Sequence, residues 1–202
     1  MTTQIHFILD KSGSMESCRA DTIGGFNSFV RRQRELNADN CIMSLYQFDN
    51  LYEIIYKNKN IKEVPELSFE SFQPNGMTAL LDAIGITINN IVQNNDNIIV
   101  VILTDGEENS SETFRKNQIN DLIKAKKDSG WEIVFLGANQ DAIKEAENLG
   151  IGGQSALTYS AEGHGTSNAF TCLSDAISRS RSTPMAKIAF TPEERVKSLS
   201  KQ

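Results

Sequence analysis

The sequence lacks the features that identify several common classes of protein. No apolar run reaches the roughly 18 to 20 residues of a membrane-spanning helix, and the first residues show no basic or long apolar segment of a secretory signal. The three cysteines, Cys18, Cys41 and Cys172, are far apart and form no CxxC pair. Neither a zinc site nor a disulfide framework is therefore predicted. We expect a soluble cytoplasmic protein with reduced thiols and no membrane partner.

Positive charge is also scarce. The 26 acidic residues outnumber the 20 Lys and Arg residues, which gives a formal net charge of −6, and Lys and Arg cluster only in short pieces such as residues 124–127. A surface of this kind repels a phosphate backbone, so no nucleic-acid partner is expected. The chain also has no glycine-rich loop ending in Gly-Lys-Ser/Thr, which excludes a P-loop for nucleotide phosphates.

An apolar segment near the start ends in side chains that carry oxygen. Residues 5–9 are mostly apolar and are followed by Asp10, Ser12 and Ser14 at alternate positions. A strand at this place would present these oxygens at its carboxyl end, where ligands gather in open α/β sheets. Carboxylate and hydroxyl oxygens are hard donors, suited to Mg²⁺, Mn²⁺ or Ca²⁺.

Two later segments repeat this arrangement. Thr78 precedes a helical pattern over residues 79–92, and Asp105 follows the uncharged, β-branched run 98–103. If the strands 5–9 and 98–103 are neighbours, the loops that follow them meet where the strand order reverses. Each residue alone could be a helix cap or a turn residue. Together they predict one cation site, formed by Asp10, Ser12, Ser14, Thr78 and Asp105.

The order of elements predicts a three-layer, doubly wound, Rossmann-like α/β fold. The expected strands are residues 5–9, 41–48, 51–56, 98–103, 133–136 and 156–159, and helical patterns include residues 23–34, 79–92, 112–127, 141–149 and 166–179. The hairpin over 41–56 would add one antiparallel strand to a mainly parallel six-stranded sheet with helices on both faces. Ser14 or Ser17 is expected to cap the first helix. We assign residues 1–181 to this domain and expect 182–202 to form a polar, flexible tail.

Three motifs resemble the metal-ion-dependent adhesion site (MIDAS) of von Willebrand factor type A (vWA) domains, in an intracellular bacterial or phage-like form. They are DKSGSM at 10–15, GMTALLDA at 76–83 and LTDG at 103–106, and the resemblance covers residues 4 to about 138. It implies that Ser12, Ser14 and Thr78 bind the ion directly, with Asp10 and Asp105 bound directly or through water. The implied ion is Mg²⁺, with Mn²⁺ or Ca²⁺ as alternatives, and an acidic residue of a partner completes its coordination.

The expected function is therefore metal-dependent protein–protein interaction by a chain that is a monomer by itself. Neutral hydroxyl ligands leave much of the ion's charge uncompensated, which favours an incoming Glu, Asp or C-terminal carboxylate. The loops that would provide specificity are residues 47–51, 73–77, 105–111 and 137–141. We interpret Glu107 and Glu108 as solvated loop charges that add to the attraction of a cation, with direct ligation of the ion as the alternative.

The main alternative is a Mg²⁺-dependent phosphatase of the haloacid-dehalogenase type, with Asp10 as the nucleophile. That family uses a second aspartate two positions later as a general acid, a role that Ser12 cannot fill at neutral pH. An EF-hand loop is excluded because Met15 stands where glycine is required. No serine lies in a nucleophile-elbow motif. We therefore expect no enzymatic activity.

Overall fold

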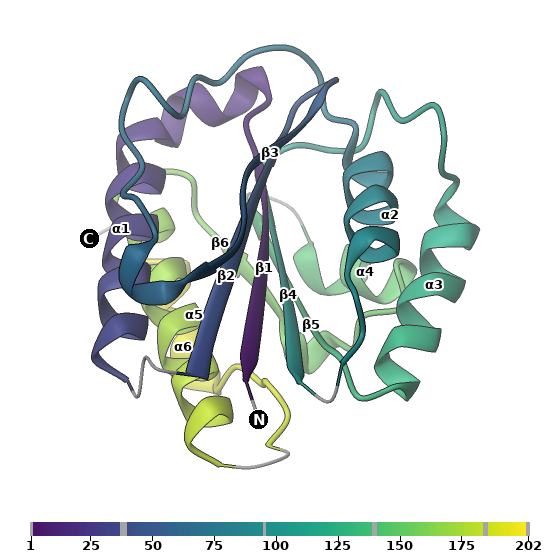
Figure 1. Ribbon diagram of the computed structural model, residues 1–202. Helices are drawn as coiled ribbons and strands as arrows, with labels where there is room; N and C mark the ends of the chain where they lie inside the picture. Colours follow the sequence, from purple (N-terminus) through teal and green to yellow (C-terminus); the bar gives the residue numbers. More distant parts are fainter. Residues whose placement is uncertain (1, 37–39, 95, 139–140, 184–185, 201–202) are drawn as a thin grey trace.

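The computed structural model describes residues 2–36, 40–94, 96–138, 141–183 and 186–200, which form a sheet between two layers of helices (Figure 1). The strands are β1 (Thr3–Asp10), β2 (Cys41–Phe48), β3 (Tyr52–Asn60), β4 (Asn97–Thr104), β5 (Glu132–Ala138) and β6 (Ala156–Tyr159). The α-helices are α1 (Arg19–Glu35), α2 (Leu80–Asn90), α3 (Lys116–Asp128), α4 (Ala142–Asn148), α5 (Gly165–Ser182) and α6 (Pro192–Ser198). Short 3₁₀ helices cover Gly13–Cys18, Ile61–Glu63 and Gly153–Ser155.

The six strands follow the order β3-β2-β1-β4-β5-β6. Among the described residues only β3 is antiparallel to its neighbour, which confirms the predicted mixed sheet. From β1 the chain adds β2 and then β3 on one side. It then crosses back and adds β4, followed by β5 and β6, on the other side of β1. Leu9 lies opposite Leu103 in this central pair. The carboxyl ends of β1 and β4 are therefore adjacent at the point where the strand order reverses.

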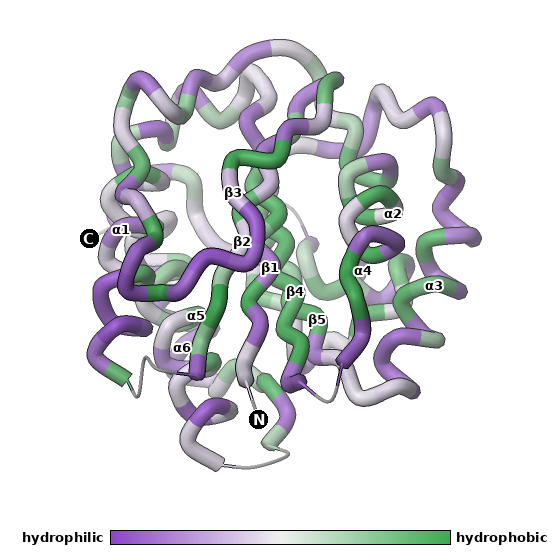
Figure 2. The backbone as a smooth tube through the Cα atoms, viewed as in Figure 1, coloured by the Kyte–Doolittle hydropathy of each residue, from purple (hydrophilic) through white to green (hydrophobic). Residues whose placement is uncertain are grey.

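The central strands are apolar because both faces of the sheet are covered. Helices α1 and α5 lie on one face and α2, α3 and α4 on the other (Figure 1). Phe7 of β1 packs against the rings of Phe26, Phe29 and Phe170, with centroids 5.4 to 6.0 Å apart. Ile8, the next residue, belongs to the core under α2 and α3. Figure 2 shows the resulting concentration of hydrophobic residues along the inner strands.

Several predicted boundaries need correction. The hairpin is present, but β3 continues to Asn60, four residues beyond its predicted end. Neither Ser14 nor Ser17 caps α1, because a 3₁₀ helix over Gly13–Cys18 precedes it and Cys18 is at the N-cap without a side-chain hydrogen bond. Helix α3 begins at Lys116 rather than at residue 112.

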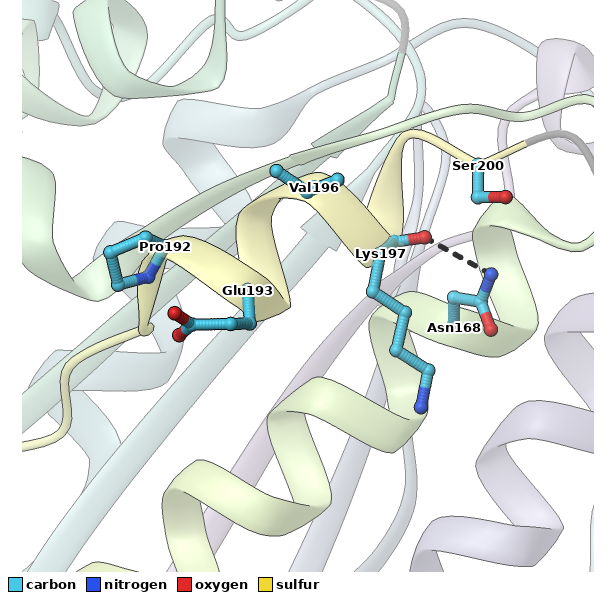
Figure 3. Close-up of a pocket in the computed structure, with 6 residues that line it drawn as sticks. All are labelled: Asn168, Pro192, Glu193, Val196, Lys197 and Ser200. Atoms are coloured by element: carbon cyan, nitrogen blue, oxygen red, sulfur yellow. Dashed lines mark hydrogen bonds between the residues drawn. The ribbon is translucent and has the colours of Figure 1, made fainter.

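The prediction of a polar, flexible tail is wrong for residues 186–200, which fold back onto the molecule. Thr191 and Glu194 form a capping box at the start of α6. Arg195 donates hydrogen bonds to the carbonyl oxygens of Gly153 and Ala156, beside β6, at 2.9 and 2.8 Å. The side chain of Asn168 on α5 also donates to the carbonyl oxygen of Lys197 (3.1 Å; Figure 3). The polar composition of this segment reflects these hydrogen bonds and a short helix that is exposed on one side.

Two further features concern membrane-spanning helices and the three cysteines. In the part that the structure describes, no helix combines the length and the apolar composition needed to cross a bilayer. Cys18, Cys41 and Cys172 are all free thiols and all buried.

Candidate metal centre

The loops after β1 and β4 meet through their polar side chains. Ser12 and Ser14 lie in the loop after β1, and their Oγ atoms are 3.2 Å apart. Ser14 Oγ donates a 2.6 Å hydrogen bond to Asp105 Oδ1, which lies just after β4. Asp105 is half-buried, so part of this contact faces solvent. The reversal of strand order therefore produces the contact between the two loops that the sequence predicted.

The third predicted segment joins them at Gly106. A Cβ atom placed on Gly106 would lie 2.9 Å from Thr78 Oγ1, 3.4 Å from Ser14 Oγ and 3.6 Å from Ser12 Oγ. Three hydroxyl oxygens thus surround one small space, which a side chain at this position would enter. Glycine leaves this space free. The donors are all oxygen, as Mg²⁺ and other hard cations require.

Asp10 lies below these hydroxyls and is fully buried. Its Oδ1 accepts a hydrogen bond from the backbone N–H of Ser12 (2.6 Å), and its Oδ2 accepts one from Thr104 Oγ1 (2.5 Å). Burial raises the pKa of Asp10 to about 6, against the lowering effect of these hydrogen bonds and with a smaller contribution from the nearby charge of Asp105. Burial also raises the pKa of Asp105, and the hydrogen bond from Ser14 opposes it. A cation nearby would stabilise both charged carboxylates.

Two carboxylates connect α2 to the loop after β4, in structural roles that the sequence did not reveal. Glu108 Oε2 accepts from the backbone N–H of Leu81 (2.8 Å), and its Oε1 accepts from those of Ser110 and Ser111 (3.0 and 2.7 Å). Glu108 is therefore a structural residue, which corrects its interpretation as a solvated loop charge. Its other partner is the hydroxyl of Ser111, which donates to Oε2 (2.7 Å). Because three of the four donors are backbone N–H groups, no side-chain pattern in the sequence indicated this role.

Asp82 makes the reciprocal connection from α2. Its carboxylate accepts hydrogen bonds from the backbone N–H groups of residues 112, 113 and 114, at 2.8, 3.0 and 2.7 Å. These bonds explain why α3 does not begin at residue 112. Asn109 is paired with Thr78 through two bonds, Thr78 N–H to Asn109 Oδ1 (2.9 Å) and Asn109 N–H to the Thr78 carbonyl (3.0 Å). These two bonds fix the position of Thr78 relative to the loop that carries Asp105.

The loop before Thr78 is tied to the β1 and β2 loops. The Gly13 N–H donates to the Gly76 carbonyl (3.1 Å), and Ala79 N–H donates to the Asp49 carbonyl (2.9 Å). Gly76 has a φ of +72°, a conformation that glycine adopts without strain. These loops gather at the upper edge of the molecule in Figure 1. Of the fourth predicted specificity loop, residues 139–140 lie outside the described residues.

The structure thus brings together the oxygens of Ser12, Ser14, Thr78 and Asp105 and places Asp10 directly beneath them. Within the described residues no cluster of three or more His, Cys, Asp or Glu side chains could hold a metal ion. The hydroxyl groups are therefore essential to the predicted ligand set, and the role of these residues as ligands remains a prediction.

One cavity adjoins this centre, and a second lies away from it. The first, of about 360 Å³, is lined by Leu80, Leu81, Gly106, Glu107, Glu108, Lys116 and Glu145. A larger one, of about 610 Å³, lies between α5 and α6 and is lined by Asn168, Pro192, Glu193, Val196, Lys197 and Ser200 (Figure 3). The larger cavity contains none of the predicted ligands. We therefore place the candidate function at the metal centre.

Comparison with known proteins agrees with the fold described above. The sequence model of the von Willebrand factor type A domain matches residues 4–171, beyond the expected limit near 138. A search of curated proteins found no match. Among solved structures, the vWF domain of the type V pili tip protein Mfa5 from Porphyromonas gingivalis has a TM-score of 0.68 at 10% identity, covering 87% of this chain and 95% of that one.

Two further structures are similar over most of this chain. Proximal thread matrix protein 1 from the mussel byssus, solved with a zinc-occupied MIDAS motif, has a TM-score of 0.61 at 17% identity, covering 88% of this chain and 44% of that one. The ArnB paralog VWA2 from Sulfolobus acidocaldarius has a TM-score of 0.59 at 18% identity, covering 87% and 44%. The chain spans 45% of the length of the mussel protein in another crystal form. At these identities the likeness shows the fold alone.

Proposed function

Since this chain belongs to the von Willebrand factor type A domain family, we propose that it binds another protein through a divalent cation held at the carboxyl ends of β1 and β4. The proposed ligands are Asp10, Ser12, Ser14, Thr78 and Asp105. The observation that carries the proposal is the convergence of three hydroxyl oxygens on the space above Gly106, with Asp105 hydrogen-bonded to one of them.

The proposed ion is Mg²⁺, with Mn²⁺ or Ca²⁺ as alternatives, because every nearby donor is a hard oxygen. Asp10 uses both oxygens for hydrogen bonds within the protein. Its proposed role is therefore to bind the ion through water, to orient Ser12 and to supply negative charge from below. Ser12, Ser14 and Thr78 are neutral, so the bound ion keeps an electrophilic position toward solvent.

The proposed ligand of that position is a carboxylate of a partner protein, either Glu, Asp or a chain terminus. A carboxylate supplies the negative charge that the hydroxyl ligands do not. One ionic contact is small compared with a stable protein interface, so the surrounding loops provide the remaining contacts and the specificity. We expect reversible binding that depends on the metal.

Asp10 is badly placed to be the nucleophile of a phosphatase. It is fully buried, and its two oxygens accept from Ser12 N–H and Thr104 Oγ1. An attacking carboxylate would need an oxygen accessible to substrate. The proposal is therefore a binding function without turnover.

Calorimetric titration with MgCl₂ tests the metal centre. Thr78→Ala and Ser12→Ala should each weaken Mg²⁺ binding by about tenfold or more, since they remove a proposed ligand. Thr113→Ala is the matched control, because this exposed threonine lies in the neighbouring loop but outside the centre. Equal affinity in wild type, Thr78→Ala and Ser12→Ala would reject the ligand assignment.

An affinity pull-down tests the interaction itself. Proteins retained from the source lysate in Mg²⁺ should be released by chelator and should not be retained by Thr78→Ala. Trp131 is buried, so its fluorescence reports whether the variant keeps its fold. A partner retained equally well in chelator would place the interaction surface elsewhere.

We further propose that the isolated protein is a cytoplasmic monomer. Its free, buried thiols are compatible with a reducing compartment. Fractionation of the source cells and light scattering of the purified chain test the two statements. Recovery from the cell surface, or a dimer in Mg²⁺ without partner, would contradict them.

A further inference from the structure

We propose that the cavity beside the metal centre receives a Lys or Arg side chain from the same partner segment that supplies the acidic residue. This inference rests on the proposed function and specifies the partner's chemistry. It predicts a recognition segment in which an Asp or Glu and a basic residue lie within three positions of each other.

The cavity adjoins the candidate metal centre at Gly106. Its volume is about 360 Å³, and its walls come from the start of α2, the loop after β4, the start of α3 and helix α4. Gly106 lines the cavity and also borders the space between the hydroxyls of Ser12, Ser14 and Thr78. A group bound at the ion therefore has the cavity beside it.

The lining has an apolar part and a charged part. Leu80 and Leu81 are almost fully buried and contribute apolar surface. Glu107, Glu108 and Glu145 provide three carboxylates against the single ammonium group of Lys116. Lys and Arg combine an apolar stem with a cationic end, and both parts find matching surface here.

The carboxylates differ in what they can offer a ligand. Glu145 already pairs with Lys116, at 2.8 Å between Oε1 and Nζ. Glu108 is fixed by backbone N–H groups, including that of Leu81. Glu107 is exposed and makes no hydrogen bond or ion pair with the described part of the chain. Glu107 is thus the carboxylate available to a partner's cation.

The position of Glu107 explains why both partner residues should lie in one short segment. Glu107 follows Gly106 directly in the chain. An extended segment advances about 3.3 Å per residue, so three positions span roughly 10 Å. The excess of carboxylates would also repel a second acidic residue of the partner, which makes the paired signal more selective than an acidic residue alone.

Selection of a phage-displayed library of random linear dodecapeptides tests the proposal. Wild-type protein in MgCl₂ is the target, and phage are eluted with EDTA and sequenced. The expected peptides contain Asp or Glu with Lys or Arg within three positions, enriched several-fold over the starting library. Peptides selected on Glu107→Gln should still be enriched in Asp or Glu but no longer in Lys or Arg. Peptides selected on Glu107→Lys should carry a second Asp or Glu in place of the basic residue.

Glu112→Gln is the matched control, because Glu112 is exposed in the same loop and does not line the cavity. It should select the same peptides as wild type. A synthetic peptide from the selection should then lose about tenfold in affinity for wild type when its basic residue is changed to Ala, and less than about twofold for Glu107→Gln.

The possible outcomes separate the two proposals. Acidic peptides without a basic preference would overturn the cavity assignment and leave the metal-dependent interaction intact. Equal loss of the basic preference in Glu112→Gln would trace it to overall charge and would also overturn the cavity assignment. A library that yields no EDTA-eluted acidic peptides would overturn the proposed function.

Discussion

Gly106 controls access to the space that the proposed ion would occupy. In Gly106→Ala the new methyl group would lie 2.9 Å from Thr78 Oγ1, so we expect Mg²⁺ affinity to fall by at least about tenfold. The φ of Gly106 is not in the left-handed region, so alanine should not strain the backbone. Calorimetry measures the loss. Gly24→Ala is the control, because a Cβ there meets no atom within 4 Å.

His6 should make stability depend on pH. It is buried between Tyr46 Oη and Gln4 Oε1, each 3.1 Å from a ring nitrogen, and its pKa is lowered to about 4, mainly by burial and further by the charge of Lys57. Between about pH 6.5 and 4 the unfolded chain therefore binds a proton that the folded chain does not. The contribution of His6 to stability is fully present above this window and is lost as the pH decreases through it.

Urea unfolding in EDTA at pH 7 and pH 4.5 measures this effect. The loss attributable to His6 should be about 2 to 3 kcal/mol over this interval. His6→Gln should be less stable at pH 7, because it loses the ring's packing, but should show a correspondingly smaller loss at pH 4.5. Equal pH dependence in the two proteins would contradict the prediction.

The roles of some residues could be predicted from the sequence, and the roles of others could not. Asp10, Ser12 and Asp105 stand directly after apolar strands, a local pattern that any reading of the chain can detect. Asp82 and Glu108 accept hydrogen bonds from backbone groups about 30 residues away. Such partners are set by tertiary packing, so these two roles could not be predicted.

At the scale of elements, the loop after β4 and helix α2 act as one unit. Asp82→Asn removes the charge that gathers three N–H groups of the loop, and should increase hydrogen exchange at residues 112–114. Because Thr78 is paired with Asn109 of the same loop, Mg²⁺ affinity should also fall several-fold. Exchange mass spectrometry and calorimetry provide the two readouts.

Asp121→Asn is the matched control for this prediction, because Asp121 is exposed on α3 and bonds none of these groups. It should change neither quantity. Faster exchange in Asp82→Asn with unchanged Mg²⁺ affinity would show that the loop is not needed to position Thr78.

Elements with a clear apolar periodicity could be predicted from the sequence, whereas the short helix α6 could not. Apolar alternation and β-branched runs gave every strand of the sheet, including the hairpin partner β3. Helix α6 has only seven residues, and Val196 on its surface is 73% exposed. Its stability comes from the capping box and from the contact of Arg179 with Glu194 (2.7 Å), which composition alone does not indicate.

For the whole molecule, the proposed ion should stabilise the fold. An ion that binds only the folded state at ten times its Kd contributes about 1.4 kcal/mol. For a chain of this size the melting temperature should rise by about 3 to 6 °C. Scanning calorimetry with MgCl₂ and with EDTA measures this shift, which Thr78→Ala should abolish. An equal shift in Thr78→Ala would mean that Mg²⁺ acts at another place.

The doubly wound arrangement also imposes an order of events during synthesis. Strand β1 is made first but needs β4 to cover its second edge, and the bond between Asp10 and Thr104 joins residues 94 positions apart. At 5 to 20 residues per second, the ribosome takes roughly 5 to 20 seconds to bridge that interval. Until then the central strand has an open edge, so the nascent chain passes through a period of vulnerability to aggregation that ends when the proposed metal centre can first assemble.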